Sequence, residues 1–150
     1  MGLFSSLRGK PANDAGTQIA RSVLVMPLVT AVADGKLDDL ELREVVNLCA
    51  QSPIFLAIGA ERTLQLAKEV LADFGKRGAE AVFAEALQTL TPALCETAFC
   101  FSVRVAVADG HLDQSEKDTL SAMGSRMGIP VEKFNQILEV LGMLERPAAA

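Results

Sequence analysis

The sequence contains one eleven-residue pattern twice, and this repeat constrains the fold more than any other feature. The first copy is Ala-Val-Ala-Asp-Gly-Lys-Leu-Asp-Asp-Leu-Glu at 31–41, and the second is Ala-Val-Ala-Asp-Gly-His-Leu-Asp-Gln-Ser-Glu at 106–116. The offset is a constant 75 residues, and the first five residues of the two copies are identical. A match of this length at a fixed offset indicates an internal duplication. We therefore expect residues 25–55 and 100–130 to form helix–turn–helix units related by an approximate twofold axis.

Helical periodicity runs through almost the whole chain, and no convincing segment has the two-residue period of a β-strand. Half of the 150 residues are apolar, which is enough to bury a sizeable core in one domain. Pro27 lies inside the first apolar run, where it should kink or split the helix. An apolar connector at 54–58 must be packed. The predicted helices cover residues 17–33, 38–50, 60–74, 79–90, 91–108, 113–127 and a last segment from 130.

The sequence therefore predicts an all-α, single-domain bundle of about seven helices with an internal pseudo-twofold duplication. The helix over 91–108 is apolar on nearly every side, which is typical of the centre of a bundle. We expect residues 1–16 to be a flexible leader, residues 17–144 to form the helical domain and residues 145–150 to be a disordered tail.

The charge and the aromatic content argue against nucleic acid as a partner. The formal net charge is −5, whereas binding by phosphate neutralisation needs a basic face. The chain has no Trp and no Tyr, so the usual platforms for base stacking are missing. We find no uninterrupted apolar run of the roughly 18–20 residues that a membrane-spanning helix needs. At most, we expect peripheral contact with a membrane.

The cysteines indicate a reducing compartment. Cys49, Cys95 and Cys100 cannot all pair, and their spacing does not match a metal site. Cys95 and Cys100 lie five apart on a predicted helix, so their side chains point about 140° apart. We predict that these two are not joined, and that the thiols are reduced and mostly buried. A cytoplasmic location follows from this prediction.

Helix capping explains much of the repeated motif. Gly35 and Gly110 suit the left-handed residue that closes a helix. Each copy then has an Asp that can cap the next helix and a Glu three residues later, which is the pattern of a capping box. On this interpretation the motif is a helix-turn-helix corner without chemistry, and its acidic face is architectural or faces a partner.

Asp34 and Asp109 do not fit this interpretation well. They lie at the C-terminal ends of helices, where the helix dipole disfavours a negative side chain. The same unfavourable choice at both corners suggests a function, such as binding a hard divalent cation like Ca²⁺ or Mg²⁺ with oxygen ligands. The spacing is not that of an EF-hand loop. The candidate metal ligands are Asp34, Asp38, Glu41, Asp109, Asp113 and Glu116.

The chain resembles the tellurite-resistance protein B (TerB) family at these residues. The similarity rests on Ala-Asp-Gly-x-Leu-Asp-x-x-Glu at 33–41, on its copy at 108–116 and on Met-Gly-Ile-Pro-x-x-x-Phe at 127–134. It extends over about residues 17–144. The resemblance implies a compact pseudo-twofold bundle that is located in the cytoplasm or at the inner face of the membrane. It also implies a role in tellurite or general chemical stress.

The resemblance further implies metal binding through the six acidic residues named above, and other resistance or stress proteins as partners. The basic leader that is common in such proteins is thinner here, with only Arg8 and Lys10. We see no nucleophile with an adjacent base, no glycine-rich phosphate loop and no redox pair of cysteines, so we expect a non-catalytic protein.

Two functions from different classes therefore remain open. The first is a stress protein whose duplicated acidic motif holds a divalent cation. The second is a protein–protein interaction module, either co-chaperone-like or a scaffold, in which the acidic corner is purely structural.

Overall fold

The computed structural model describes residues 10–33, 35–108, 110 and 112–148, with side chains from residue 15 onward. Within these ranges every regular element is an α-helix and no strand occurs, which confirms the predicted all-α bundle. The helices are α2 (Lys10–Val32), α3 (Asp39–Cys49), α4 (Pro53–Leu56), α5 (Ala60–Arg77), α6 (Ala79–Thr89), α7 (Pro92–Ala106), α8 (Gln114–Arg126) and α9 (Val131–Leu144).

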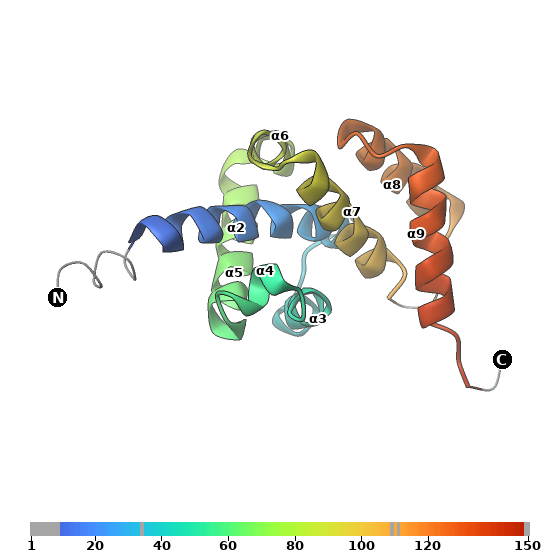
Figure 1. The fold of residues 1–150 in the computed structure, drawn as a ribbon, viewed down its shortest axis with the longest axis horizontal. Coiled ribbons are helices and arrows are strands. Elements are labelled where there is room, and N and C mark those ends of the chain that lie inside the picture. Colours follow the sequence, from blue (N-terminus) through green and yellow to red (C-terminus); the bar gives the residue numbers. More distant parts are fainter. Residues whose placement is uncertain (1–9, 34, 109, 111, 149–150) are drawn as a thin grey trace.

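Helices α2 and α7 form the centre of the bundle. Figure 1 shows α2 running along the middle of the molecule, with α6 and α7 on one side, α3 and α4 on the other, and α8 and α9 at one end. The most extensive packing between any two described helices is that of α2 against α7. Every residue of α2 from Ser22 to Leu28 is buried, as is Phe99 in the middle of α7. The prediction of a central helix after residue 91 thus agrees with the structure.

Helix α2 is longer than predicted and is not split. It begins at Lys10, seven residues before the expected start at residue 17, so residues 10–16 are helical. Residues 1–9 lie outside the described part of the chain. Pro27 lies inside the continuous helix, although its ring nitrogen cannot donate a backbone hydrogen bond. Its neighbours Met26 and Leu28 are completely buried, and this packing holds the helix together across the proline.

One segment of α2 has the length and composition of a membrane span, which we did not expect. The window Ala15–Val32 has a mean hydropathy of 1.3 over 18 residues. However, 44% of this window is buried inside the bundle. The central helix of a helical bundle meets the same criterion, because it contacts other helices on several sides.

The apolar connector predicted at 54–58 is packed and partly helical. Ser52 caps α4, and its Oγ accepts a hydrogen bond from the backbone N–H of Ile54 at 3.3 Å. Phe55 is 1% exposed and meets the ring of Phe101 edge-on, with 6.0 Å between the ring centroids. The connector thus fixes the position of α3 relative to α7.

A glycine allows α8 to lie close to α7. A Cβ atom added at Gly124 would be only 3.1 Å from Cζ of Phe99. The Phe99 ring also packs edge-on against Phe134 of α9, with 5.5 Å between the ring centroids. Because Phe99 is completely buried, a larger residue at position 124 would displace α8 from α7.

An ion-pair network joins α2, α5 and α6 on the side of the bundle away from α8. Asp73 accepts hydrogen bonds from Arg77 at 2.8 Å and from Arg21 at 2.7 Å, both at Oδ2. Arg77 also reaches Glu85, with 3.0 Å between Nη1 and Oε2. The hydrogen bonds from Arg77 and Arg21 hold the pKa of Asp73 well below its usual range.

We predict that Asp73→Asn lowers the stability of the protein at neutral pH and reduces its acid sensitivity. A carboxylate with a lowered native pKa stabilises the fold above its unfolded-state pKa, about 3.9. That stabilisation is lost as the pH falls through the native pKa. The difference in melting temperature between wild type and variant should therefore shrink as the pH falls from about 5 to about 2.

The control is Glu69→Gln, which removes the more exposed pair with Arg62 and should change the melting temperature less than Asp73→Asn does. Melting temperatures of all three proteins across this pH range test the prediction. A difference between wild type and Asp73→Asn that does not vary with pH would contradict it.

Candidate functional site

Both copies of the repeated motif form the predicted capping boxes. At the start of α3, Asp38 Oδ1 accepts from the Glu41 N–H at 2.8 Å, and Glu41 Oε1 accepts from the Asp38 N–H at 3.0 Å. At the start of α8, Asp113 and Glu116 make the same two bonds at 2.8 and 3.2 Å. The backbone angles also agree, with φ −82° and ψ 175° at Asp38 and φ −81° and ψ 174° at Asp113.

The turn before each capping box also follows a common pattern. Gly35 has φ 136° and Gly110 has φ 80°, a range in which a side chain would be strained. The N–H of Gly35 donates to the carbonyl of Val32, and that of Gly110 donates to the carbonyl of Val107, both at 2.9 Å. The two corners therefore share their local hydrogen bonding. The predicted twofold relation of the two larger units, residues 25–55 and 100–130, stays a prediction.

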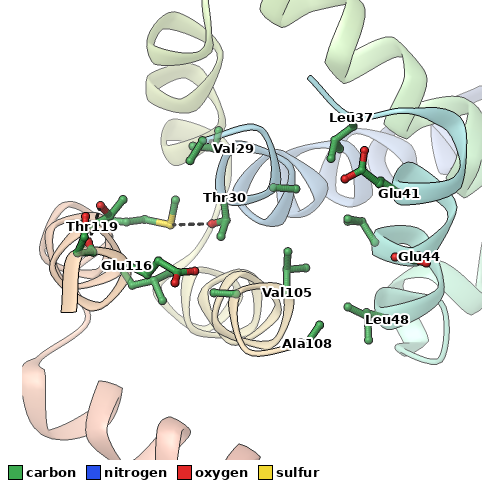
Figure 2. Close-up of a pocket in the computed structure, with 17 residues that line it drawn as sticks. Val29, Thr30, Leu37, Glu41, Glu44, Leu48, Val105, Ala108, Glu116 and Thr119 are labelled. Carbon is green, nitrogen blue, oxygen red and sulfur yellow. Dashed lines mark hydrogen bonds between the residues drawn. The ribbon is translucent and has the colours of Figure 1, made fainter. Parts of the chain in front are cut away.

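A cleft of about 470 Å³ lies between the two corners, and we name it the inter-corner cleft. The C-terminal parts of α2 and α7 line its floor, while α3 and α8 form opposite walls (Figure 2). Thr30 of α2 connects the floor to the α8 wall. Its hydroxyl lies 3.2 Å from the carbonyl oxygen of Met26 in its own helix and 3.9 Å from Sδ of Met123 in α8.

Most of the described residues that line this cleft fall into pairs with the 75-residue offset of the sequence repeat. Three of these pairs lie within the two copies of the eleven-residue pattern, and the others lie beside it in the sequence. The pairs are Thr30 with Val105, Ala31 with Ala106, Ala33 with Ala108, Glu41 with Glu116, Glu44 with Thr119, Val45 with Leu120 and Leu48 with Met123.

The charged side chains that line the cleft are all acidic among the described residues. They are Glu41 and Glu44 from α3 and Glu116 from α8, and no Lys or Arg lines it. Figure 2 shows Glu41 and Glu116 on opposite sides, with Thr30 and Val105 between them. Helices α2 and α7 end here with partially negative C-termini, and α3 and α8 begin here with partially positive N-termini, so the helix dipoles oppose each other. The cleft thus combines an apolar floor with three acidic side chains.

These three glutamates form no ion pair with any residue that the structure describes. Elsewhere on the surface, several carboxylates have a basic partner. Examples are Glu85 with Arg77 and Glu80 with Arg126, at distances of 3.0 and 2.6 Å. Because like charges in one cleft repel each other, unpaired glutamates here favour a cationic ligand.

The structure brings some of the predicted metal ligands to the cleft. Glu41 and Glu116 line it, whereas Asp38 and Asp113 are exposed caps that are not among its lining residues. Asp34 and Asp109 lie outside the described residues, so their convergence stays a prediction. Within the described residues, no group of three or more His, Cys, Asp or Glu side chains is placed to hold a metal ion. The described residues alone therefore do not form the predicted cation site. Because two of its predicted ligands lie outside them, the site stays a prediction.

Sequence reasoning missed Glu44 and the apolar floor of the cleft. Glu44 lies three residues after Glu41, so both side chains share one face of α3, and this spacing was the available signal. Val105 and Ala106 looked like bundle interior in the sequence. They line an open cleft because they lie at the end of α7, beside the end of α2.

A second pocket of about 460 Å³ is a weaker candidate. Its charged lining residues already have partners. Arg126 pairs with Glu80 and lies 4.5 Å from the centroid of the Phe83 ring, and Glu96 pairs with Lys133. These groups hold α6, α7, α8 and α9 together, so they are not available to a ligand.

All three cysteines are free thiols, which confirms that Cys95 and Cys100 are not joined. Cys49 and Cys95 are buried as expected, but Cys100 is exposed, so the expectation of burial was wrong for this residue. Burial raises the pKa of the Cys49 thiol to about 12, which makes it an inert part of the core.

Comparison of the chain with protein-family models, with curated proteins and with solved structures finds no match in any of the three. The resemblance to the TerB family therefore stays a prediction that rests on the motif residues.

We predict that the two capping boxes contribute equally to stability. Asp38→Ala and Asp113→Ala should each reduce the free energy of unfolding by about 1 kcal/mol, because each leaves a helix N–H without its acceptor. Asparagine also caps well, so Asp38→Asn and Asp113→Asn should cost only a few tenths of a kcal/mol. Urea unfolding of the four variants measures this. If the Ala and Asn variants of one corner lost the same free energy of unfolding, this result would contradict the capping role.

Proposed function

We propose that this protein is a non-catalytic interaction module of the stress-response type, and that a partner protein docks in the inter-corner cleft. The observation that carries this proposal is the cleft itself, which lies between the two motif copies and is lined by residue pairs at the same offset of 75 residues. The cleft has a volume of about 470 Å³. An apolar floor with a polar rim is also the usual composition of a docking surface.

Two of the three hydroxyl residues that line the cleft, Thr30 and Thr119, have hydroxyl groups engaged in hydrogen bonds within their own helices. A serine or threonine nucleophile needs an adjacent base that takes its proton. Here the hydroxyl of Thr119 bonds to the carbonyl of Ser115 at 3.0 Å, and that of Thr30 bonds to the carbonyl of Met26. Both hydroxyls therefore donate within their own helices.

The location and the class of partner follow from the sequence and the resemblance. We propose a cytoplasmic protein, with other resistance or stress proteins as partners and at most peripheral contact with the inner face of the membrane. The free thiols and the net charge of −5 support this proposal and disfavour nucleic acid as a partner.

Site-specific photo-crosslinking in the native cells tests the docking proposal. A benzophenone amino acid replaces Thr119 in the cleft or, as a control, the exposed Gln65 on α5. We expect a discrete crosslinked partner from position 119 only. The crosslink should disappear in a protein that also carries Ala108→Phe, since a ring at this exposed lining position fills the cleft. Crosslinks that persist in the filled protein, or that form equally from position 65, would contradict docking in the cleft.

A second candidate function is binding of a divalent cation, and one observation favours it. Glu41, Glu44 and Glu116 line one cleft at the C-terminal ends of α2 and α7. A bound Ca²⁺ or Mg²⁺ would relieve the repulsion among these groups, and carboxylate oxygens are the ligands that both ions prefer. In this proposal Asp34 and Asp109 supply the remaining carboxylates, as the motif and the resemblance suggest.

Thermal melts with chelator and with millimolar Ca²⁺ or Mg²⁺ test this second function. If a cation binds, the wild-type protein gains about 2.7 kcal/mol at an ion concentration of a hundred times the dissociation constant. The double variant Asp34→Asn/Asp109→Asn should lose this ion-dependent gain. Without bound cation, it should be as stable as wild type, or more stable by up to about 1 kcal/mol. A wild-type melting temperature that no divalent ion changes would exclude this function.

A further inference from the structure

The walls of the inter-corner cleft suit a helical ligand. They are two helices, α3 and α8, and between them lie the ends of α2 and α7 (Figure 2). The described residues include no strand, so they offer no sheet edge to which an extended peptide could add. The remaining common mode for a groove between helices is an amphipathic helix that places its apolar face in the groove.

The apolar lining of the cleft suits an apolar stripe. It includes Val105 from the α7 floor, Val45 and Leu48 from the α3 wall, and Leu120 and Met123 from the α8 wall. A helix that docks in such a groove uses residues at i, i+3 or i+4, and i+7 as anchors. A cleft of about 470 Å³ has room for about three such side chains.

The rim of the cleft suits basic side chains. Glu41, Glu44 and Glu116 line it without a basic partner among the described residues, and no described Lys or Arg lines it. A ligand with acidic flanks would be repelled, whereas one with Lys and Arg beside its apolar stripe would be attracted.

From these three features we propose that the cleft binds an amphipathic α-helix of a partner protein, with a stripe of large apolar residues flanked by Lys and Arg. This inference rests on the proposed docking function and adds the chemistry of the partner.

The test uses designed peptides of about 16 residues, labelled with fluorescein and measured by fluorescence anisotropy on the full chain. The probe has Leu at the stripe positions and Lys on both flanks. One control peptide has Glu in place of every Lys, and another has the probe's composition in scrambled order. We expect the probe to bind about tenfold more tightly than either control, and about tenfold more weakly when salt rises from about 50 to 300 mM.

A pair of charge-matched protein variants locates the binding. Glu41→Gln/Glu44→Gln/Glu116→Gln removes the charges of the cleft, while glutamine preserves both capping boxes. Its control removes the same number of charges at exposed positions outside the cleft, namely Glu61→Gln, Glu132→Gln and Glu139→Gln. We expect affinity for the probe to fall about tenfold in the cleft variant, and to stay at the wild-type level in the control. Thermal melts establish that both variants are folded.

Each outcome of these experiments supports or overturns the inference. Equal binding of the Lys and Glu peptides, or an equal loss in both protein variants, would mean that the basic helix is not the ligand of the cleft. Wild-type protein that dimerises through the cleft, with a monomeric Ala108→Phe variant, would identify a second copy as the occupant and overturn the inference. Cleft-dependent crosslinks from position 119 without probe binding would leave docking in place and exclude a basic helix. If neither the crosslinks from position 119 nor binding of the probe were observed, the docking function would be overturned as well.

Discussion

The packing of α2 against α7 is the interaction on which the rest of the structure depends. Each helix is apolar on several sides and is buried over its central turns. The C-terminal parts of the two helices line one cleft, which lies between the two corners that follow them. Helices α3 and α8 then leave the corners as the opposite walls. The burial of apolar surface between α2 and α7 thus sets the position of the cleft, because this is the largest favourable term in such a fold.

The carboxylates that the structure describes fall into two groups, those that pair with a basic side chain and those that do not. Asp73 and Glu85 lie in a network with Arg21 and Arg77, which joins three helices and lowers the pKa of both acids. The glutamates of the inter-corner cleft have no such partner among the described residues. Like charges that line one cleft repel each other, and a cationic ligand would offset this repulsion. This contrast is the physical reason to look for function at the cleft.

Local signals in the sequence predicted the corners well. The Asp and Glu of each motif are three residues apart, and this spacing alone specifies a capping box, which both corners form. Packing decided other features. Pro27 did not split α2, because the buried residues on either side hold the helix continuous. The exposure of Cys100 was also missed, since its neighbours in the sequence are as apolar as those of the buried Cys95.

The sequence by itself determined the all-α class, most helix positions and both corners, because these depend on contacts within about four residues along the chain. It also identified Glu41 and Glu116 as candidate site residues through the repeat. Only the tertiary structure decided that these residues share a cleft with Glu44, Val105 and Leu48. That arrangement depends on how closely α2, α7 and α8 approach each other, and Gly124 against Phe99 contributes to it. Such distances between remote segments arise from side-chain packing in three dimensions, which no local pattern specifies.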